Sequence, residues 1–200
     1  MKINEVKEYM LQTVSAYYGE GHVFFAGVKM PKHPVPYVTL KFYGYRKSRT
    51  GVTVFGEKDQ CHKNYWPARM MLDINLYTMG RNVSPEGKPP VYEDTSEQDL
   101  VDFLMYLSSD FMEDDLARNS MMLDIEGDIK NLSSLVNESS VFNYRSMATL
   151  KVNFTECSYG QYGQGGRELP NVSGGGHEGL LEEQDTIETI NITGIITKEG

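Results

Sequence analysis

Residues 141–156 read VFNYRSMATLKVNFTE, and this stretch decides the fold of the chain. From residue 148 to residue 155, apolar and polar side chains alternate, which is the two-residue period of a strand with one buried face. The stretch holds no glycine or proline and is rich in β-branched and aromatic residues, so nothing inside it argues against a strand. The sequence therefore predicts a central or paired strand whose buried face consists of Ala148, Leu150, Val152 and Phe154.

The same alternation recurs elsewhere in the chain and predicts further strands. The clearest are Tyr37–Tyr45 and Ala68–Tyr77, each with one apolar and one more polar face. Shorter strands are expected over His22–Gly27 and Met121–Ile129. Residues 186–197, TIETINITGIIT, are expected to form the last strand and to pair beside residues 141–156.

Two helices are predicted to pack on this sheet. Apolar residues recur at helical spacing from Ile3 to Val14, which indicates an amphipathic helix that ends before Gly19. A second helix can be capped by Asp94 or Thr95 and is expected to end near Asp110 or to fray through residues 112–120. Its apolar stripe consists of Leu100, Phe103, Leu104 and Leu107. This order of elements predicts an α+β fold with a mostly antiparallel sheet and two packed helices.

Three segments are predicted to lie outside the regular core. Residues 82–90 contain Pro85, Pro89 and Pro90 and are expected to be loop. Residues 46–63 are basic and turn-rich and predict a protruding β-hairpin arm, and residues 158–180 predict a long glycine-rich loop. A length of 200 residues fits a single domain that includes this arm and this loop.

The net charge of −9 conceals a separation of charge along the chain. Residues 21–70 hold nine Lys and Arg against two acidic residues, whereas residues 93–128 hold twelve Asp and Glu against Arg118 alone. Such a division suggests that oppositely charged faces meet, either within the subunit or between copies of it. The alternative is that both runs are solvated faces without a partner.

The sequence indicates a protein made in a cytoplasm, without a membrane segment. The N-terminus has scattered charges and no apolar signal core, and no stretch approaches the roughly eighteen apolar residues of a membrane span. Cys61 and Cys157 are too few for a disulfide framework and are expected to be free thiols.

Nucleotide and zinc sites are disfavoured by spacing. Gly163, Gly165 and Gly166 resemble part of a nucleotide fingerprint, but Arg-Glu-Leu-Pro follows them instead of Lys-Ser/Thr or a helix. Four residues could in principle ligate zinc, namely Cys61, His62, Cys157 and His177. Only Cys61 and His62 are near each other, and adjacent strand residues point to opposite faces. No cofactor and no metal are therefore expected.

Two other chemistries remain as alternatives. Carboxylates on candidate strands could bind Mg²⁺ for nuclease chemistry, although outward-facing strand carboxylates are the ordinary explanation. The run from Lys41 to Arg49 interleaves basic and aromatic side chains, as binders of single-stranded nucleic acid do, but a pI near 5.0 favours an acidic protein surface as its partner. The candidate metal-binding carboxylates are Asp73, Asp124, Glu126 and Asp128.

The order of several short motifs resembles that of tailed-bacteriophage neck and tail terminator proteins. An amphipathic helix is followed by PVPYVTL from residue 34, MLDINLYTMGRN from residue 71 and an acid-capped helix. NLSSLV from residue 131, NYRSMATLKVNF from residue 143 and a terminal I-x-x-I-x-I-T-G strand then follow. Each motif is loose, and the order of the motifs is what indicates the family. The segments 46–63 and 158–180 have no counterpart in this pattern.

The resemblance implies a structural virion protein and no enzyme. Such a protein forms a ring, commonly hexameric, at the head-proximal end of the tail tube, where it stops tube growth and joins the tail to the connector or neck proteins. DNA passes through its lumen, and assembly takes place in the host cytoplasm. Another virion ring, such as a head-completion or tail tube protein, is the alternative. The expected contact residues are Tyr45, Arg46, Lys47, Arg49, Lys58, Lys63, Tyr159, Tyr162, Arg167, Glu113, Asp114 and Asp115.

Overall fold

The computed structural model describes residues 1–27, 35–56, 61–133 and 144–159. The chain divides into two compact units. The first unit consists of Met1–Lys47 and Ala68–Thr155, and the second includes Ser48–Pro67 and the residues from Glu156 onward. The first unit contains the helices and most of the sheet.

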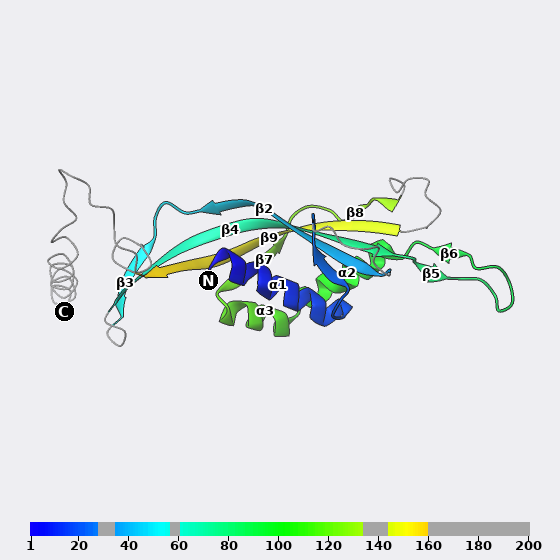
Figure 1. Cartoon of the computed structure of the whole chain (residues 1–200), viewed down its shortest axis with the longest axis horizontal. Coiled ribbons are helices and arrows are strands. Elements are labelled where there is room, and N and C mark those ends of the chain that lie inside the picture. The colour runs from blue at the N-terminus through cyan, green and yellow to red at the C-terminus, as the bar shows by residue number, and fades with distance from the viewer. Residues whose placement is uncertain (28–34, 57–60, 134–143, 160–200) are drawn as a thin grey trace. The chain divides into compact units, whose positions relative to one another are not determined.

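The sheet of the first unit has the strand order β1-β2-β4-β9-β7 (Figure 1). Strand β1 runs parallel to β2, whereas β2 pairs antiparallel with β4, and both β7 and β8 pair antiparallel with β9. The expected α+β fold with a mostly antiparallel sheet is therefore confirmed. The strands are β1 (Val23–Phe25), β2 (Tyr37–Lys47), β4 (Cys61–Thr78), β7 (Met121–Ile125), β8 (Lys130–Asn131) and β9 (Tyr144–Tyr159).

Strand β9 occupies the position that its sequence predicts. It lies between β4 on one side and β7 and β8 on the other, so it is paired along both edges. The four alternating apolar residues are all buried, each with 4% or less of its surface exposed, because they face the helices. These residues are Ala148, Leu150, Val152 and Phe154. The expected partner strand, residues 186–197, lies outside the described residues.

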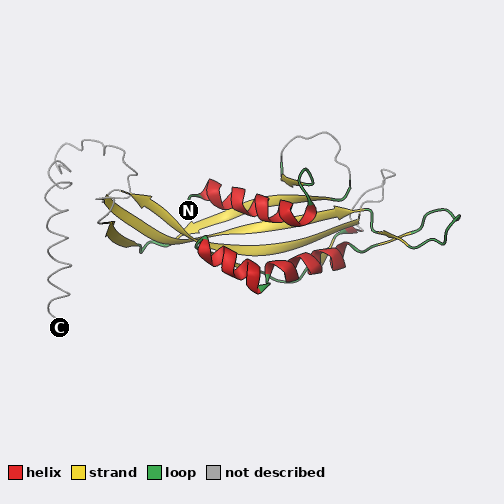
Figure 2. Cartoon of the chain, turned by 90° about the horizontal axis from the view of Figure 1, so that it is seen from below, coloured by secondary structure: helices red, strands yellow, loops and turns green. Residues whose placement is uncertain are grey.

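In the described part of the chain, three helices cover one face of this sheet (Figure 2). Helix α1 (Ile3–Tyr18) ends at Gly19, as the spacing of its apolar residues predicts. Helix α2 (Ser96–Leu107) buries its predicted stripe, in which Phe103 and Leu100 are fully buried. Together with the inward side chains of β2, β4 and β9, these stripes form a single hydrophobic core.

The prediction of two helices is wrong, because a third helix follows α2. Helix α3 (Asp110–Arg118) was expected to be a frayed end, yet it is a separate helix. The side chain of Ser109 accepts a hydrogen bond from the backbone nitrogen of Met112, so a new N-terminus is capped there. Met112 and Leu116 then bury one side of α3 in the core.

Strand boundaries also differ from the sequence prediction. Strand β4 begins at Cys61, seven residues before the predicted start, because β3 (Val52–Gly56) pairs with its first five residues in the second unit. The predicted loop from residue 82 is framed by a small two-stranded sheet of β5 (Arg81–Asn82) and β6 (Tyr92–Glu93). Strand β7 ends at Ile125, earlier than predicted.

Asp94 fixes the start of α2 through several hydrogen bonds. Its carboxylate accepts from the backbone nitrogen and the hydroxyl of Ser96, from the amide of Asn131 and from the hydroxyl of Ser133. Ser96 is fully buried, and its hydroxyl lies 2.8 Å from that of Ser146 on β9. Burial raises the pKa of Asp94, but hydrogen bonds from Ser96, Ser133 and Asn131 outweigh this and lower it below the usual 3.8.

This lowered pKa predicts a contribution to stability that depends on pH. A carboxyl group whose pKa is lower in the folded state than in the unfolded state stabilises the fold above the unfolded value near 3.8. The contribution should be lost as the pH falls below 3.8 toward the folded pKa. Urea unfolding at pH 6, 4 and 3 measures the free energy of unfolding. This free energy should fall more steeply with decreasing pH in the native protein than in Asp94→Asn. Equal pH slopes in the two proteins would contradict this role of Asp94.

Candidate functional site

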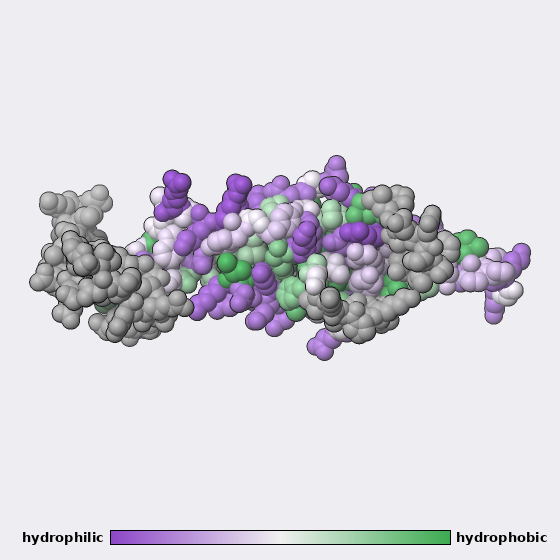
Figure 3. Space-filling view, turned by 45° about the horizontal axis from the view of Figure 1, so that its top comes forward, coloured by the Kyte–Doolittle hydropathy of each residue, from purple (hydrophilic) through white to green (hydrophobic). Residues whose placement is uncertain are grey.

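The face of the sheet opposite the helices, which we call the open face, is mainly polar. Side chains that alternate with the core residues of β2, β4, β9 and β7 project from it. Figure 3 brings this side of the first unit forward and shows hydrophilic side chains with hydrophobic ones between them. The polar and aromatic residues of the open face include Lys41, Tyr43, Asp73, Asn75, Tyr77, Asp124, Arg145, Thr149, Lys151 and Asn153.

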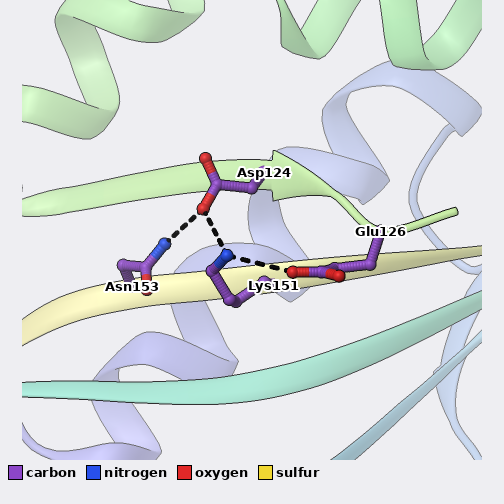
Figure 4. Close-up of polar contacts among 4 residues, drawn as sticks. All are labelled: Asp124, Glu126, Lys151 and Asn153. Atoms are coloured by element: carbon purple, nitrogen blue, oxygen red, sulfur yellow. Dashed lines mark hydrogen bonds and ion pairs between the residues drawn. The ribbon is translucent and has the colours of Figure 1, made fainter.

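Lys151 lies at the centre of the most highly charged cluster on the open face. Its ammonium group is 3.0 Å from a carboxylate oxygen of Asp124 and 3.0 Å from one of Glu126 (Figure 4). Asp124 is the direct cross-strand partner of Lys151 in the β7–β9 pair. The amide of Asn153, two residues further along β9, donates a 2.8 Å hydrogen bond to the same Asp124 oxygen.

The charges of this cluster shift each other's pKa values. The hydrogen bond from Lys151 lowers the pKa of Asp124, and although burial opposes this, the amide of Asn153 lowers it further. Hydrogen bonds to Glu126 and Asp124 raise the pKa of Lys151. One cation thus compensates two carboxylates, which leaves a net negative charge on this part of the open face.

Removal of the central cation should change the titration of its neighbour. In Lys151→Met the pKa of Asp124 should rise from its lowered value, because the ammonium that favours the carboxylate is gone. NMR titration of the side-chain carboxyl resonances measures this change. Since the side chains of the cluster are partly exposed to solvent, the shift in the native protein should also shrink at high salt.

Lys88→Met provides a matched control for this titration. It removes a lysine in an exposed loop of the first unit. The pKa of Asp124 should be the same in this variant as in the native protein. An Asp124 pKa that is unaltered in Lys151→Met would show that the ion pair is not formed in solution.

Two further groups of contacts link neighbouring strands on the open face. The carboxylate of Asp73 on β4 accepts hydrogen bonds from the hydroxyl of Tyr43 at 3.1 Å and from that of Thr149 at 2.8 Å. Arg145 donates to the side-chain oxygen of Asn75 at 2.8 Å, and its guanidinium lies 5.3 Å from the ring centroid of Tyr77. These contacts join β2, β4 and β9, so the open face is an ordered surface.

The carboxylates proposed for metal-dependent chemistry are separated or already paired. Asp124 and Glu126 share Lys151, Asp73 accepts hydrogen bonds from two hydroxyls, and Asp128 is exposed after β7. Throughout the described ranges, no three side chains of the metal-binding types lie together. The open face can therefore present charge and hydrogen-bonding groups to a partner surface.

The two cysteines are free thiols, as the sequence predicts. Next to Cys61, His62 is buried, with its ring 5.1 Å from that of Phe55 in the second unit. The more distant candidate ligand, His177, lies outside the described residues.

The predicted basic and aromatic contact residues are spread over several parts of the chain. Tyr45, Arg46 and Lys47 are exposed at the end of β2 in the first unit, and Arg49 is exposed in the second unit. Lys63 is half-buried on β4. Tyr159 is the last residue of β9, and Lys58, Tyr162 and Arg167 lie outside the described residues.

The predicted acidic contact residues all lie on α3. Glu113 and Asp114 are exposed, whereas Asp115 is half-buried and accepts a hydrogen bond from the hydroxyl of Tyr9 on α1. Burial and the contact with Asp115 raise the pKa of Tyr9 to about 12. Asp115 thus connects α3 to α1, and Glu113 and Asp114 remain available to a partner.

No family model and no curated sequence matches the chain. Within the described ranges, no helix has both the length and the apolar character needed to span a bilayer.

Proposed function

We propose that this chain is a structural subunit of a ring at the head-proximal end of a bacteriophage tail. The ring ends the tail tube and joins it to the neck or connector, and DNA passes through its lumen. The proposal starts from the order of sequence motifs, which resembles that of tail terminator proteins. It assigns the chain to the virion and gives it no catalytic role and no cofactor.

The observation that carries the proposal is the separation of exposed charge within the first unit. Acidic side chains project from α3 at Glu113 and Asp114, whereas Arg46 and Lys47 are exposed at the end of β2. A subunit with opposite charges on different elements can bind the next copy head to tail. Head-to-tail contacts of this kind close into a ring when the rotation between copies allows it.

The segments 46–63 and 158–180 are the proposed contacts with the tail tube and the connector. In the described part of the first segment, β3 pairs with the start of β4, which gives a hairpin with exposed Val52 and Val54. We propose that this hairpin protrudes from the ring. Proteins bind DNA when their cationic side chains neutralise phosphates and release the counterions. Acidic residues facing the lumen would instead repel the phosphates, so passing DNA would not adhere.

The proposal is tested by imaging and by sedimentation of the purified chain. Negative-stain images should show discrete rings, and addition of the chain to growing tail tubes should cap each tube once. A chain that stays monomeric at high concentration and leaves tube length unregulated would overturn the proposal. Repetition of the chain along the tube would favour a tube protein, and binding to heads alone would favour a head-completion protein.

The same preparation tests the nuclease alternative. Cleavage of DNA that is stimulated by a divalent metal and lost in Asp124→Ala or Glu126→Ala would support an enzyme. Under the proposed function, neither the native chain nor these variants should cleave DNA.

A further inference from the structure

A cavity of about 220 Å³ lies between α1 and α2 in the first unit, next to the ends of β2 and β4. Tyr17 and Tyr18 at the end of α1 form one wall, and Leu76 and Pro36 form an apolar wall. Asp99 and Asp102 on α2 contribute two carboxylates. We call this cavity the acidic pocket.

The tyrosines of the acidic pocket belong to an aromatic cluster. The rings of Tyr17 and Tyr18 meet edge to face at 4.9 Å, and both pack against Phe103 at 5.0–5.1 Å. Tyr17 keeps 40% of its surface exposed although it is a large aromatic residue. An aromatic ring held in a fixed position beside an opening can bind a cation over its face.

The field in the acidic pocket is negative. The described lining residues include no lysine, arginine or histidine. Asp99 accepts a 3.0 Å hydrogen bond from the hydroxyl of Thr95, and Asp102 accepts a 2.8 Å hydrogen bond from the amide of Gln98. Both donors are neutral groups, so neither of them compensates the negative charge of a carboxylate. Burial raises the pKa of Tyr17, and the charges of Asp102 and Asp99 raise it further.

A complementary pair of cations lies at the end of β2. The β2–β4 register shifts between Tyr43 and Arg46, at the positive-φ Gly44, so Arg46 lies directly opposite Arg69. Directly paired strand residues project from the same face, and like charges in this position repel each other. Both arginines are exposed, and no acidic partner of either is found in the ranges that the structure describes. An anionic partner would therefore stabilise the pair.

We propose that the acidic pocket of one copy receives the Arg46–Arg69 pair of a second copy. Two carboxylates match two guanidinium groups in charge, and a guanidinium can stack on Tyr17 while it bonds to Asp102 or Asp99. Pocket and arginine pair lie on different parts of the subunit, so the contact is head to tail and each copy can use both. The inference rests on the proposed ring and names the residues that would join its subunits.

Neutral substitutions provide a sharp test by sedimentation velocity. The pocket variant is Asp99→Asn with Asp102→Asn, and the arginine variant is Arg46→Gln with Arg69→Gln. Each should weaken self-association by about tenfold or more, because a charged group then faces a neutral one. An equimolar mixture should form a 1:1 dimer and stop there, since the arginine variant keeps an intact pocket and the pocket variant keeps intact arginines.

Matched controls use exposed residues outside both sites. Glu97→Gln lies on α2 away from the pocket lining, and Lys88→Gln removes a loop cation; both should assemble like the native chain. Circular dichroism checks the fold of each variant. If the double pocket variant does not fold, the single change Asp102→Asn at an exposed position should still weaken association.

The outcomes separate this inference from the proposed function. If the native chain forms rings and both variants assemble with native affinity, the inference is wrong and the ring stands. Loss of assembly in each variant without a 1:1 dimer in the mixture would also overturn it, because the two sites would not meet. A native chain that is monomeric at all concentrations would overturn both.

Discussion

Leu150→Ala should lower the free energy of unfolding by about 2–5 kcal/mol, because the cost of the lost apolar surface adds to that of the cavity left behind. Leu150 is 1% exposed, and its strand, β9, is paired on both edges, so the surrounding structure has little freedom to collapse into the space. Urea unfolding followed by circular dichroism, at a fixed protein concentration, measures the change.

Met122→Ala is the matched control for this prediction. Met122 lies on the neighbouring strand β7, and 56% of its surface is exposed. Its truncation should change the free energy of unfolding by less than about 0.5 kcal/mol. If Leu150→Ala had as small an effect as Met122→Ala, β9 would not be a core strand.

The core face of the sheet could be predicted from the sequence because burial imposes a strict period. A strand that packs on helices must place every second residue in the core, so Leu150 and Val152 on β9 were identified by their spacing alone. The same holds for Leu72 and Ile74 on β4, and for Phe103 at helical spacing on α2. These patterns are local, and they need no knowledge of which strand pairs with which.

The elements that the sequence did not predict depend on contacts between distant residues or on short local signals. Helix α3 has few apolar residues, and the capping by Ser109 that begins it is a single side-chain contact. The first seven residues of β4 appear turn-rich in sequence and become strand because β3 pairs with Cys61–Tyr65. The stabilisation that comes from pairing with another strand cannot be inferred from the sequence of one segment alone.

The candidate sites show the same limit. Alternation placed Thr149, Lys151 and Asn153 on the outer face of β9, but only the register with β7 places Lys151 opposite Asp124. Arg46 faces Arg69 because of the irregularity at Gly44, which shifts the strand by one residue relative to simple alternation. Such an irregularity has no clear signal in the sequence, since glycine also occurs in regular strands.

A large effect is also expected for Gly80→Ala, at the base of the β5–β6 sheet. Gly80 has a φ of +73°, where an L-residue is strained by about 1–2 kcal/mol. A Cβ atom there would overlap the carbonyl oxygen of Glu93 and would lie 2.8 Å from the ring of Tyr144, and such overpacking costs about 1–3 kcal/mol. We therefore expect a combined loss of about 2–5 kcal/mol in urea unfolding. Amide hydrogen exchange in Gly80→Ala should show that the β5–β6 pairing opens before the rest of the first unit.

Gly87→Ala separates backbone strain from the steric overlap. Gly87 has a similar φ of +82°, but a Cβ atom there would meet nothing within 4 Å. Its substitution should therefore cost only the conformational strain of about 1–2 kcal/mol, and the amides of Asn82 and Tyr92 should keep their native exchange rates. Tyr144 reaches this region from β9, where its hydroxyl donates to the carbonyl of Tyr92 at 2.9 Å. If Gly80→Ala and Gly87→Ala had equal effects, the close approach of Glu93 and Tyr144 to Gly80 would be disproved, and the β5–β6 sheet would not be fixed to β9 at this point.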